Sequence, residues 1–130
     1  MFQKSVPEAY EGNWNDGRLN NRAKAYLDGV DDIAFVDAIL AQTEHNYHVD
    51  RARIDATGFS NGAIFCHYLA AHRSDVFAAI APVSGTIAIP LSAWFHPKFP
   101  VSLLEIHGTS DPIVPYAEAG SQTTVERYLA

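Results

Sequence analysis

The chain has 130 residues, a length at which about one domain with a single core is expected. Apolar residues make up 48% of the sequence and the formal net charge is −6. This composition is that of an ordinary globular protein, and it argues against a nucleic-acid or anionic-membrane partner, which would require clustered Lys and Arg. No apolar run approaches the roughly 20 residues of a membrane span, and "MFQKSVPEAY" lacks the features of a signal peptide, so neither membrane insertion nor targeting is expected.

Cys66 is the only cysteine. An intrachain disulfide and a multi-thiolate zinc site are therefore impossible, and a lone cysteine is most often a small buried apolar residue. His45 and His48 are spaced i, i+3, but His48 is expected beyond the helix end, so a metal site is not expected there without an acidic third ligand nearby. We therefore expect neither a metal nor a cofactor.

The first half of the chain predicts a long loop and then a helix. Residues 7 to 29 are rich in Gly, Asn, Asp and Pro, which is typical of a loop that is either functional or disordered. From Val30 to Leu40 the apolar residues recur near helical spacing, with Asp31 and Asp32 in the first turn. A helix is predicted from about Asp31 to His45.

Strands and helices then alternate. A short strand is predicted around Arg53 to Thr57, and a helix follows in "NGAIFCHYLAAHR". Further buried strands are predicted in "VFAAIAPVSG" and in Val101 to Ile106, with a proline-rich loop, "TIAIPLSAWFHPKFP", between them and a helix starting in "GSQTTVERYLA". This order predicts an α/β fold with a parallel sheet flanked by helical connections.

Residues 58 to 62, "GFSNG", have the G-x-S-x-G pattern between the predicted strand and helix. In a nucleophile elbow, the serine occupies a sharp strand-to-helix turn, so Ser60 is the candidate nucleophile. Gly58 and Gly62 are expected because side chains there would clash as strand and helix approach. Asn61 starts the helix, where its backbone N–H is suited to an oxyanion hole. The alternative is that Ser60 caps the helix in an ordinary turn.

Asp111 follows the predicted strand that ends at Ile106, where a triad acid would lie. The alternative is an Asp-Pro turn. A triad in this order needs a histidine after Asp111, but His107 is the last histidine in the sequence. To serve instead, the His107 side chain would have to turn across its own loop to reach both Asp111 and Ser60. The helix carrying His67 and His72 points away from the elbow, so we expect both to be solvent-facing or packed, and nothing recommends His96.

Five blocks in one order, "WNDG", "VDDIAFVDAIL", "YHVDRARIDATGFSNGAIFCHYLA", "FAAIAPVSG" and "LLEIHGTSDPIVPY", resemble the polyhydroxybutyrate-depolymerase-like esterases of the α/β-hydrolase superfamily, relatives of feruloyl and acetylxylan esterases. The resemblance implies that Ser60 is the nucleophile, Asp111 the acid in the 107–116 loop, and Asn61 the oxyanion donor. It also implies that His107 is structural, and it places Trp14 and Asn15 near the mouth of the site, with the alternative that Trp14 only packs the loop. An extracellular esterase acting on polyester, feruloyl or acetyl-type substrates is expected.

The sequence also departs from this family. Ala63 stands where members commonly have a second glycine, and the family's first strands with their His-Gly loop and its last strand with the catalytic histidine have no counterpart. We therefore expect residues 1–130 to be the central part of a single α/β-hydrolase domain with little turnover of its own. The alternatives are a non-catalytic α/β interaction module or decayed hydrolase, which would self-associate or bind a partner through exposed sheet surface, and a serine peptidase of the same superfamily.

Overall fold

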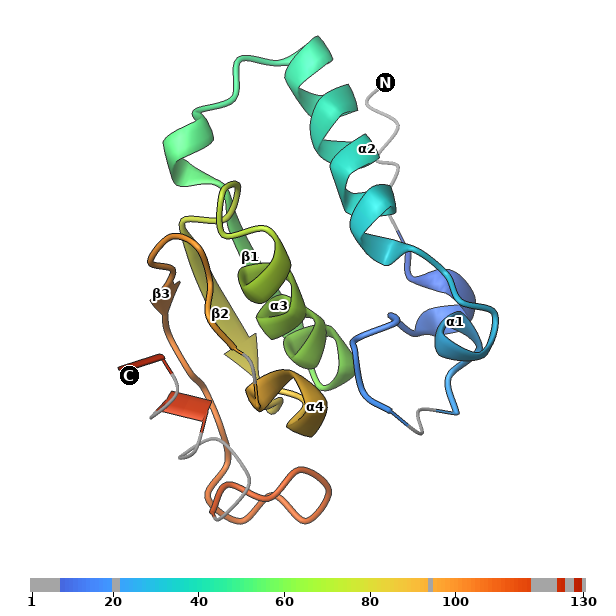
Figure 1. Cartoon of the computed structure of the whole chain (residues 1–130), viewed down its shortest axis with the longest axis vertical. Coiled ribbons are helices and arrows are strands. Elements are labelled where there is room, and N and C mark those ends of the chain that lie inside the picture. The colour runs from blue at the N-terminus through green and yellow to red at the C-terminus, as the bar shows by residue number, and fades with distance from the viewer. Residues whose placement is uncertain (1–7, 20–21, 94, 118–123, 126–127, 130) are drawn as a thin grey trace.

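A small parallel sheet forms the centre of the molecule. The computed structural model of the chain describes residues 8–19, 22–93, 95–117, 124–125 and 128–129. Three parallel strands lie in the order β1 (Asp55–Phe59), β2 (Ala79–Val83) and β3 (Ser102–Leu103). Helix α3 (Asn61–His72) connects β1 to β2 and packs against both (Figure 1). The predicted α/β class with a parallel sheet is confirmed.

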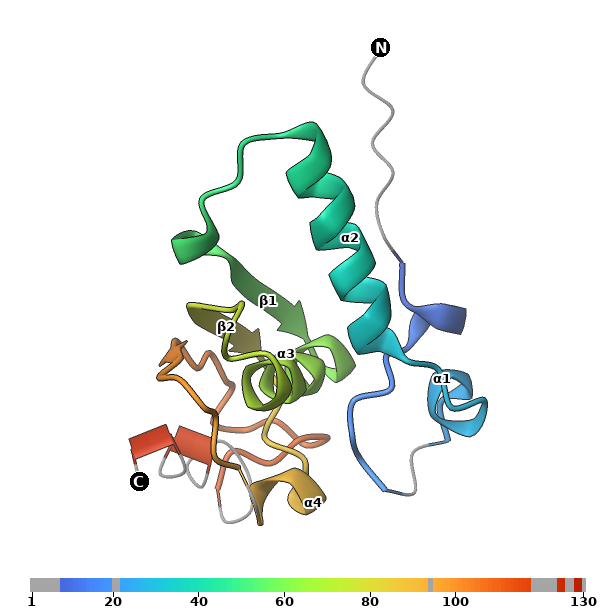
Figure 2. The same ribbon diagram turned by 45° about the horizontal axis from the view of Figure 1, so that its top comes forward.

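Helix α3 is buried on nearly all sides. Of its twelve residues, seven are buried, so it is less an amphipathic surface helix than a core element. Ile64 packs in one apolar cluster with Ile80 of the sheet, whereas Phe65 packs in a second cluster with Phe77. Side chains of α2 (Asp32–Asn46) border this second cluster, and α2 lies beside α3 in Figure 2.

The predicted helix Asp31–His45 is confirmed within one residue at each end. Its first residue is Asp32, because Asp31 acts as the N-cap and its Oδ1 accepts the Ala34 N–H at 3.0 Å. The helix ends at Asn46, so His48 lies beyond it.

The start of the first strand was predicted wrongly. Arg51–Arg53 form a 3₁₀ turn, and β1 begins only at Asp55. The cause is local: Asp50 accepts the Ala52 N–H at 3.0 Å and bonds Arg53 Nε at 2.7 Å, which holds these residues in a turn.

Short helical turns interrupt the two predicted loops. The 7–29 segment contains a 3₁₀ turn, Tyr10–Gly12, and helix α1 (Lys24–Leu27), and the proline-rich segment contains α4 (Ile89–Ser92). Pro90 lies in the first turn of α4, where a missing N–H costs nothing. Of the predicted C-terminal helix, residues 124–125 and 128–129 are helical, while 118–123, 126–127 and 130 lie outside the described residues.

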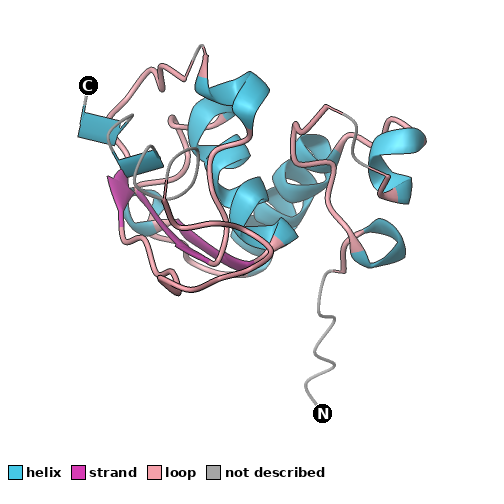
Figure 3. Ribbon diagram, turned by 90° about the horizontal axis from the view of Figure 1, so that it is seen from below, coloured by secondary structure: helices cyan, strands magenta, loops and turns pink. Residues whose placement is uncertain are grey.

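One face of the sheet is covered and the other is open. Ile80 and Pro82 of β2 are buried towards α3, and the strands lie together at one side of the molecule in Figure 3. On the opposite face, Phe59, Leu104 and Ile106 are 70%, 61% and 47% exposed. We call these three residues the open sheet face.

Candidate active site

Ser60 occupies a strained turn between β1 and α3. Its backbone has φ 52° and ψ −116°, a region that non-glycine residues rarely adopt. The turn is held by the Ser60 N–H, which donates to the Val83 carbonyl at 2.9 Å, and by the Ser60 carbonyl, which accepts from Ala63 and Ile64. Its side chain makes no capping hydrogen bond, so the alternative interpretation of Ser60 as a capping side chain is wrong.

The two elbow glycines have different surroundings. A Cβ at Gly58 would lie 2.4 Å from the Gly62 carbonyl oxygen, so the predicted clash is confirmed there. A Cβ at Gly62 would meet only the Trp14 ring edge at 3.8 Å, an ordinary contact, and the predicted clash there is wrong. The second close approach is at Gly85, where a Cβ would lie 2.4 Å from Ala63 Cβ and 3.0 Å from the Ser60 carbonyl oxygen.

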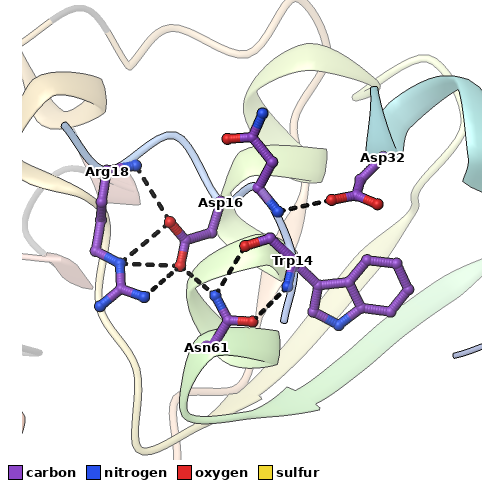
Figure 4. A network of polar contacts seen from close by, with 6 residues as sticks. Trp14, Asp16, Arg18, Asp32 and Asn61 are labelled. Carbon is purple, nitrogen blue, oxygen red and sulfur yellow. Dashed lines mark hydrogen bonds and ion pairs between the residues drawn. The ribbon is translucent and has the colours of Figure 1, made fainter. Parts of the chain in front are cut away.

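The side chain of Asn61 binds the loop that precedes α1 (Figure 4). Its Oδ1 accepts the Trp14 N–H at 2.7 Å, and its Nδ2 donates to the Trp14 carbonyl at 3.1 Å and to Asp16 Oδ2 at 2.5 Å. Asp16 is fully buried and pairs with Arg18, with Nη2 2.7 Å from Oδ2. We call this set, Trp14, Asp16, Arg18 and Asn61, the loop lock. The Asn61 backbone N–H has no acceptor among the residues described, as an oxyanion donor requires.

Trp14 and Asn15 are both held by contacts within the protein. The Trp14 ring stacks on Phe65 with centroids 4.9 Å apart. The Asn15 backbone N–H donates to Asp32 Oδ2 at 2.6 Å, and its side-chain Nδ2 donates to the Val30 carbonyl at 3.0 Å. Burial raises the pKa of Asp32. These contacts favour a packing role for both residues, and the substrate-binding role assigned from the resemblance stays a prediction.

Asp111 is held as an ionised carboxylate. Its Oδ1 accepts the backbone N–H groups of Ile113 at 2.9 Å and Val114 at 3.0 Å. These bonds from Val114 and Ile113 lower the pKa of Asp111 most, with smaller contributions from His107 and a hydrogen bond with the Ser84 side chain. The turn expected of an Asp-Pro sequence is therefore present, and the same turn prepares a carboxylate that could orient a histidine.

His107 supports the acid loop from inside. Its Nε2 donates to the Val114 carbonyl at 2.7 Å and lies 3.6 Å from Asp111 Oδ2, so the side chain does reach Asp111. Its Nδ1 lies 3.6 Å from Glu105 Oε1, and the side chain is fully buried. Because both ring nitrogens face groups other than Ser60, the geometry favours a structural role. His67 is also fully buried, 3.6 Å from the other oxygen of Glu105, and so belongs to the packed alternative.

Several residues of the site were not singled out from the sequence. Glu105 could have been found, because an acid and a histidine two residues apart in an apolar strand share one face. Gly85 lies just after β2, the strand that pairs with β1, and a glycine directly after an apolar strand is also a visible signal. The burial of Asp16 and the positive φ of Ser84, 51°, depend on contacts distant in sequence and leave no local signal.

Among the described residues there is no exposed thiol, no cluster of metal ligands and no helix that could span a membrane. Cys66 is buried as predicted, and burial raises its pKa to about 12, so the thiol stays protonated. In the described part of the chain, no three His, Cys, Asp or Glu side chains are grouped to hold a metal ion. None of the helices in that same part is long and apolar enough to cross a membrane.

Comparisons with known proteins agree on one group of enzymes. Residues 20–129 match the family model described as phospholipase/carboxylesterase. A probable feruloyl esterase C of Aspergillus niger is 35% identical over 76% of this chain and 35% of its own length. Feruloyl esterase C of Emericella nidulans is 39% identical over 65% of this chain and 30% of its own length. The chain thus spans about a third of the length of these relatives.

Two matches at lower sequence identity are also to esterases. A bifunctional acetylxylan esterase/xylanase of Neocallimastix patriciarum is 29% identical over 71% of this chain and 13% of its own length. The crystal structure of a thermostable esterase superposes with a TM-score of 0.60 at 24% identity, over 75% of this chain and 24% of that one. At this identity, the structural similarity establishes the α/β fold alone.

Proposed function

This chain belongs to the phospholipase/carboxylesterase family of α/β-hydrolases, and on that basis we propose that it carries the nucleophile and the acid of a serine esterase. The observation that carries the proposal is the backbone of Ser60, which is strained at the carboxyl end of β1 while its hydroxyl is not used as a helix cap. The names of the relatives support feruloyl or acetyl esters as substrates, and the resemblance adds polyesters. The relationship also supports an extracellular location.

The proposed reaction starts at Ser60. Its Oγ attacks the ester carbonyl carbon while a histidine accepts the hydroxyl proton, and the resulting oxyanion accepts a hydrogen bond from the Asn61 N–H. The tetrahedral intermediate collapses, the alcohol leaves with the proton from the histidine, and the acyl group stays on Ser60 until water repeats these steps. Asp111 orients the histidine and stabilises its positive charge.

The base in this scheme has no assigned residue in the sequence. No histidine follows Asp111, and both nitrogens of His107 face other groups. We therefore expect the 130-residue chain to acylate slowly, because a serine hydroxyl without a base is a weak nucleophile.

The test supplies the base from solution. The wild-type chain is incubated with p-nitrophenyl acetate, with and without added imidazole, and acetylation is followed by intact mass while nitrophenol release is followed by absorbance. We expect little turnover without imidazole, and with imidazole a single acetyl adduct that peptide mapping locates at Ser60.

Two variants serve as controls. Ser60→Ala should abolish the adduct, and Ser92→Ala, at a half-buried serine in α4, should leave it unchanged. Absence of a Ser60 adduct even with imidazole would contradict the proposal and favour a non-catalytic α/β module. Robust Ser60-dependent turnover without imidazole would show instead that a base is already present.

A further inference from the structure

A cavity of about 400 Å³ adjoins the candidate active site. It lies between two loops that reach the elbow and the acid. Thr86 on its wall directly follows Gly85, whose Cβ position is 3.0 Å from the Ser60 carbonyl, and Val114 on its wall donates its N–H to Asp111. The volume is within the range of roughly 300–1,000 Å³ that small-molecule sites occupy.

The cavity wall is mostly apolar, with polar side chains at Arg18 and Thr86. Ile64, Ile87 and Ile113 are among its aliphatic lining residues, and Arg18 is the only charged side chain among the described lining residues. In an apolar cavity, a few placed polar groups fix the orientation of a ligand as well as its position, and Arg18 is the charged one here.

Arg18 is rigidly held by the loop lock. Its Nε lies 2.9 Å from Asp16 Oδ2 and its Nη2 lies 2.7 Å from the same oxygen. Asn61 bonds Asp16 from the other side. The remaining nitrogen, Nη1, donates to no residue in the described part of the chain, and the Arg18 side chain is 40% exposed. One edge of the guanidinium therefore has donors available at the cavity.

The charge of Arg18 is already balanced. The partner carboxylate of Asp16 is fully buried and lies in direct contact with the guanidinium. A ligand carboxylate at Nη1 would be attracted by Arg18 but repelled by the buried charge of Asp16, which water screens poorly. A neutral oxygen acceptor meets no such repulsion.

We propose that this cavity is a substrate subsite in which Arg18 selects an apolar group that carries an uncharged oxygen acceptor, such as a hydroxyl or ether oxygen, at the end distant from the ester. The inference rests on the proposed function for its assignment to an ester substrate. Arg18 is then a specificity-determining residue, and Asp16 and Asn61 position it.

The test compares three ligands that differ at one position. Dissociation constants of the full chain, as the Ser60→Ala variant so that no ester is consumed, are measured by calorimetry for methyl 3-phenylpropanoate, its 4-hydroxyphenyl analogue and its 4-carboxyphenyl analogue. One hydrogen bond from a charged donor predicts about three- to tenfold tighter binding of the hydroxyl ligand than of the parent. The carboxylate ligand should bind no tighter than the parent.

The position of the bound ligand and the role of Arg18 are tested separately. Amide resonances of Thr86, Ile87 and Val114 should shift on addition of the hydroxyl ligand, a readout that needs no substitution at Arg18. Arg18→Met should bring the two uncharged ligands within about twofold of each other, whereas Arg22→Met, at an exposed arginine of the same segment, should keep the preference.

Failure of this inference is distinguishable from failure of the proposed function. Equal binding of the parent and hydroxyl ligands, tighter binding of the carboxylate ligand, or shifts confined to other parts of the molecule would overturn the subsite whether or not Ser60 is acetylated. A hydroxyl preference lost with Arg18→Met would support the subsite even if no Ser60 adduct forms.

Discussion

At the scale of single residues, the two glycines of the G-x-S-x-G pattern look equivalent in the sequence but have different surroundings in the structure. The Cβ position of Gly58 runs into the backbone of Gly62, which cannot move without displacing α3. The Cβ position of Gly62 meets only the edge of Trp14 at ordinary contact distance. The pattern therefore reports one steric requirement at Gly58, and the presence of Gly62 has no steric explanation in the fold.

These surroundings predict opposite effects of the same substitution. Gly58→Ala should lower the free energy of unfolding by about 3 kcal/mol, because a backbone clash cannot be relieved by a rotamer change. Gly62→Ala should raise it by about 0.5 kcal/mol, because alanine is favoured over glycine inside a helix. Urea unfolding of both variants checks this, and equal losses at the two positions would contradict the assignment.

The sequence predicts the position of the elbow but not all of its surroundings. Ser60, Asn61 and Gly58 follow from a local pattern placed between a strand and a helix. Gly85 and Ser84 approach the elbow only because β2 pairs with β1 in register, Phe59 beside Val83. A local pattern cannot specify such a register, so residues that complete the site from a neighbouring strand stay hidden until the sheet is known.

At the scale of elements, the loop lock connects a segment without regular structure to the start of α3. The contacts join residues more than forty positions apart, Trp14 and Asp16 to Asn61. Helices α2 and α3 were predicted well because their periodicity is local, whereas "WNDG" indicates only a turn. The Asp16 carboxylate of this fragment is buried only because of the long-range contact with Asn61. A local pattern does not indicate that contact, so Asp16 was missed.

The substitution Asp16→Asn tests how much the loop lock stabilises the fold. An amide in place of the carboxylate must present its NH₂ to one of two donors, Arg18 or Asn61, so we expect a loss of about 2 kcal/mol in the free energy of unfolding and faster amide hydrogen exchange in residues 14–18. The matched control is Asp28→Asn in the exposed Lys24–Asp28 pair, where water screens the charges and the free energy of unfolding should change little. Similar losses in both variants would show that the loop lock adds little beyond a surface ion pair.

At the scale of the whole molecule, the sheet is covered on one face only. The open sheet face consists of large apolar side chains, Phe59 at the end of β1 and Leu104 and Ile106 just after β3. Exposed apolar patches of this kind favour association. Self-association of the chain through this face was expected from the sequence and stays a prediction.

Sedimentation velocity at several protein concentrations provides the measurement. The wild-type chain should sediment increasingly as a dimer or larger species at higher concentration, and Phe59→Ser should move the distribution towards monomer. Leu27→Ser is the matched control, because Leu27 in α1 is 68% exposed but lies outside the open sheet face. A wild-type chain that stays monomeric, or a Leu27→Ser effect as large as that of Phe59→Ser, would contradict the prediction.

Helix α3 contributes side chains to both apolar clusters, Ile64 to one and Phe65 to the other. No part of this core can open without releasing the helix, so the two clusters should unfold as one cooperative unit with the slowest amide exchange in α3. Because Ser60 directly precedes this helix, the elbow geometry should persist up to the global unfolding transition and vanish with it. The reactive position would then be among the last parts of the protein to lose its shape.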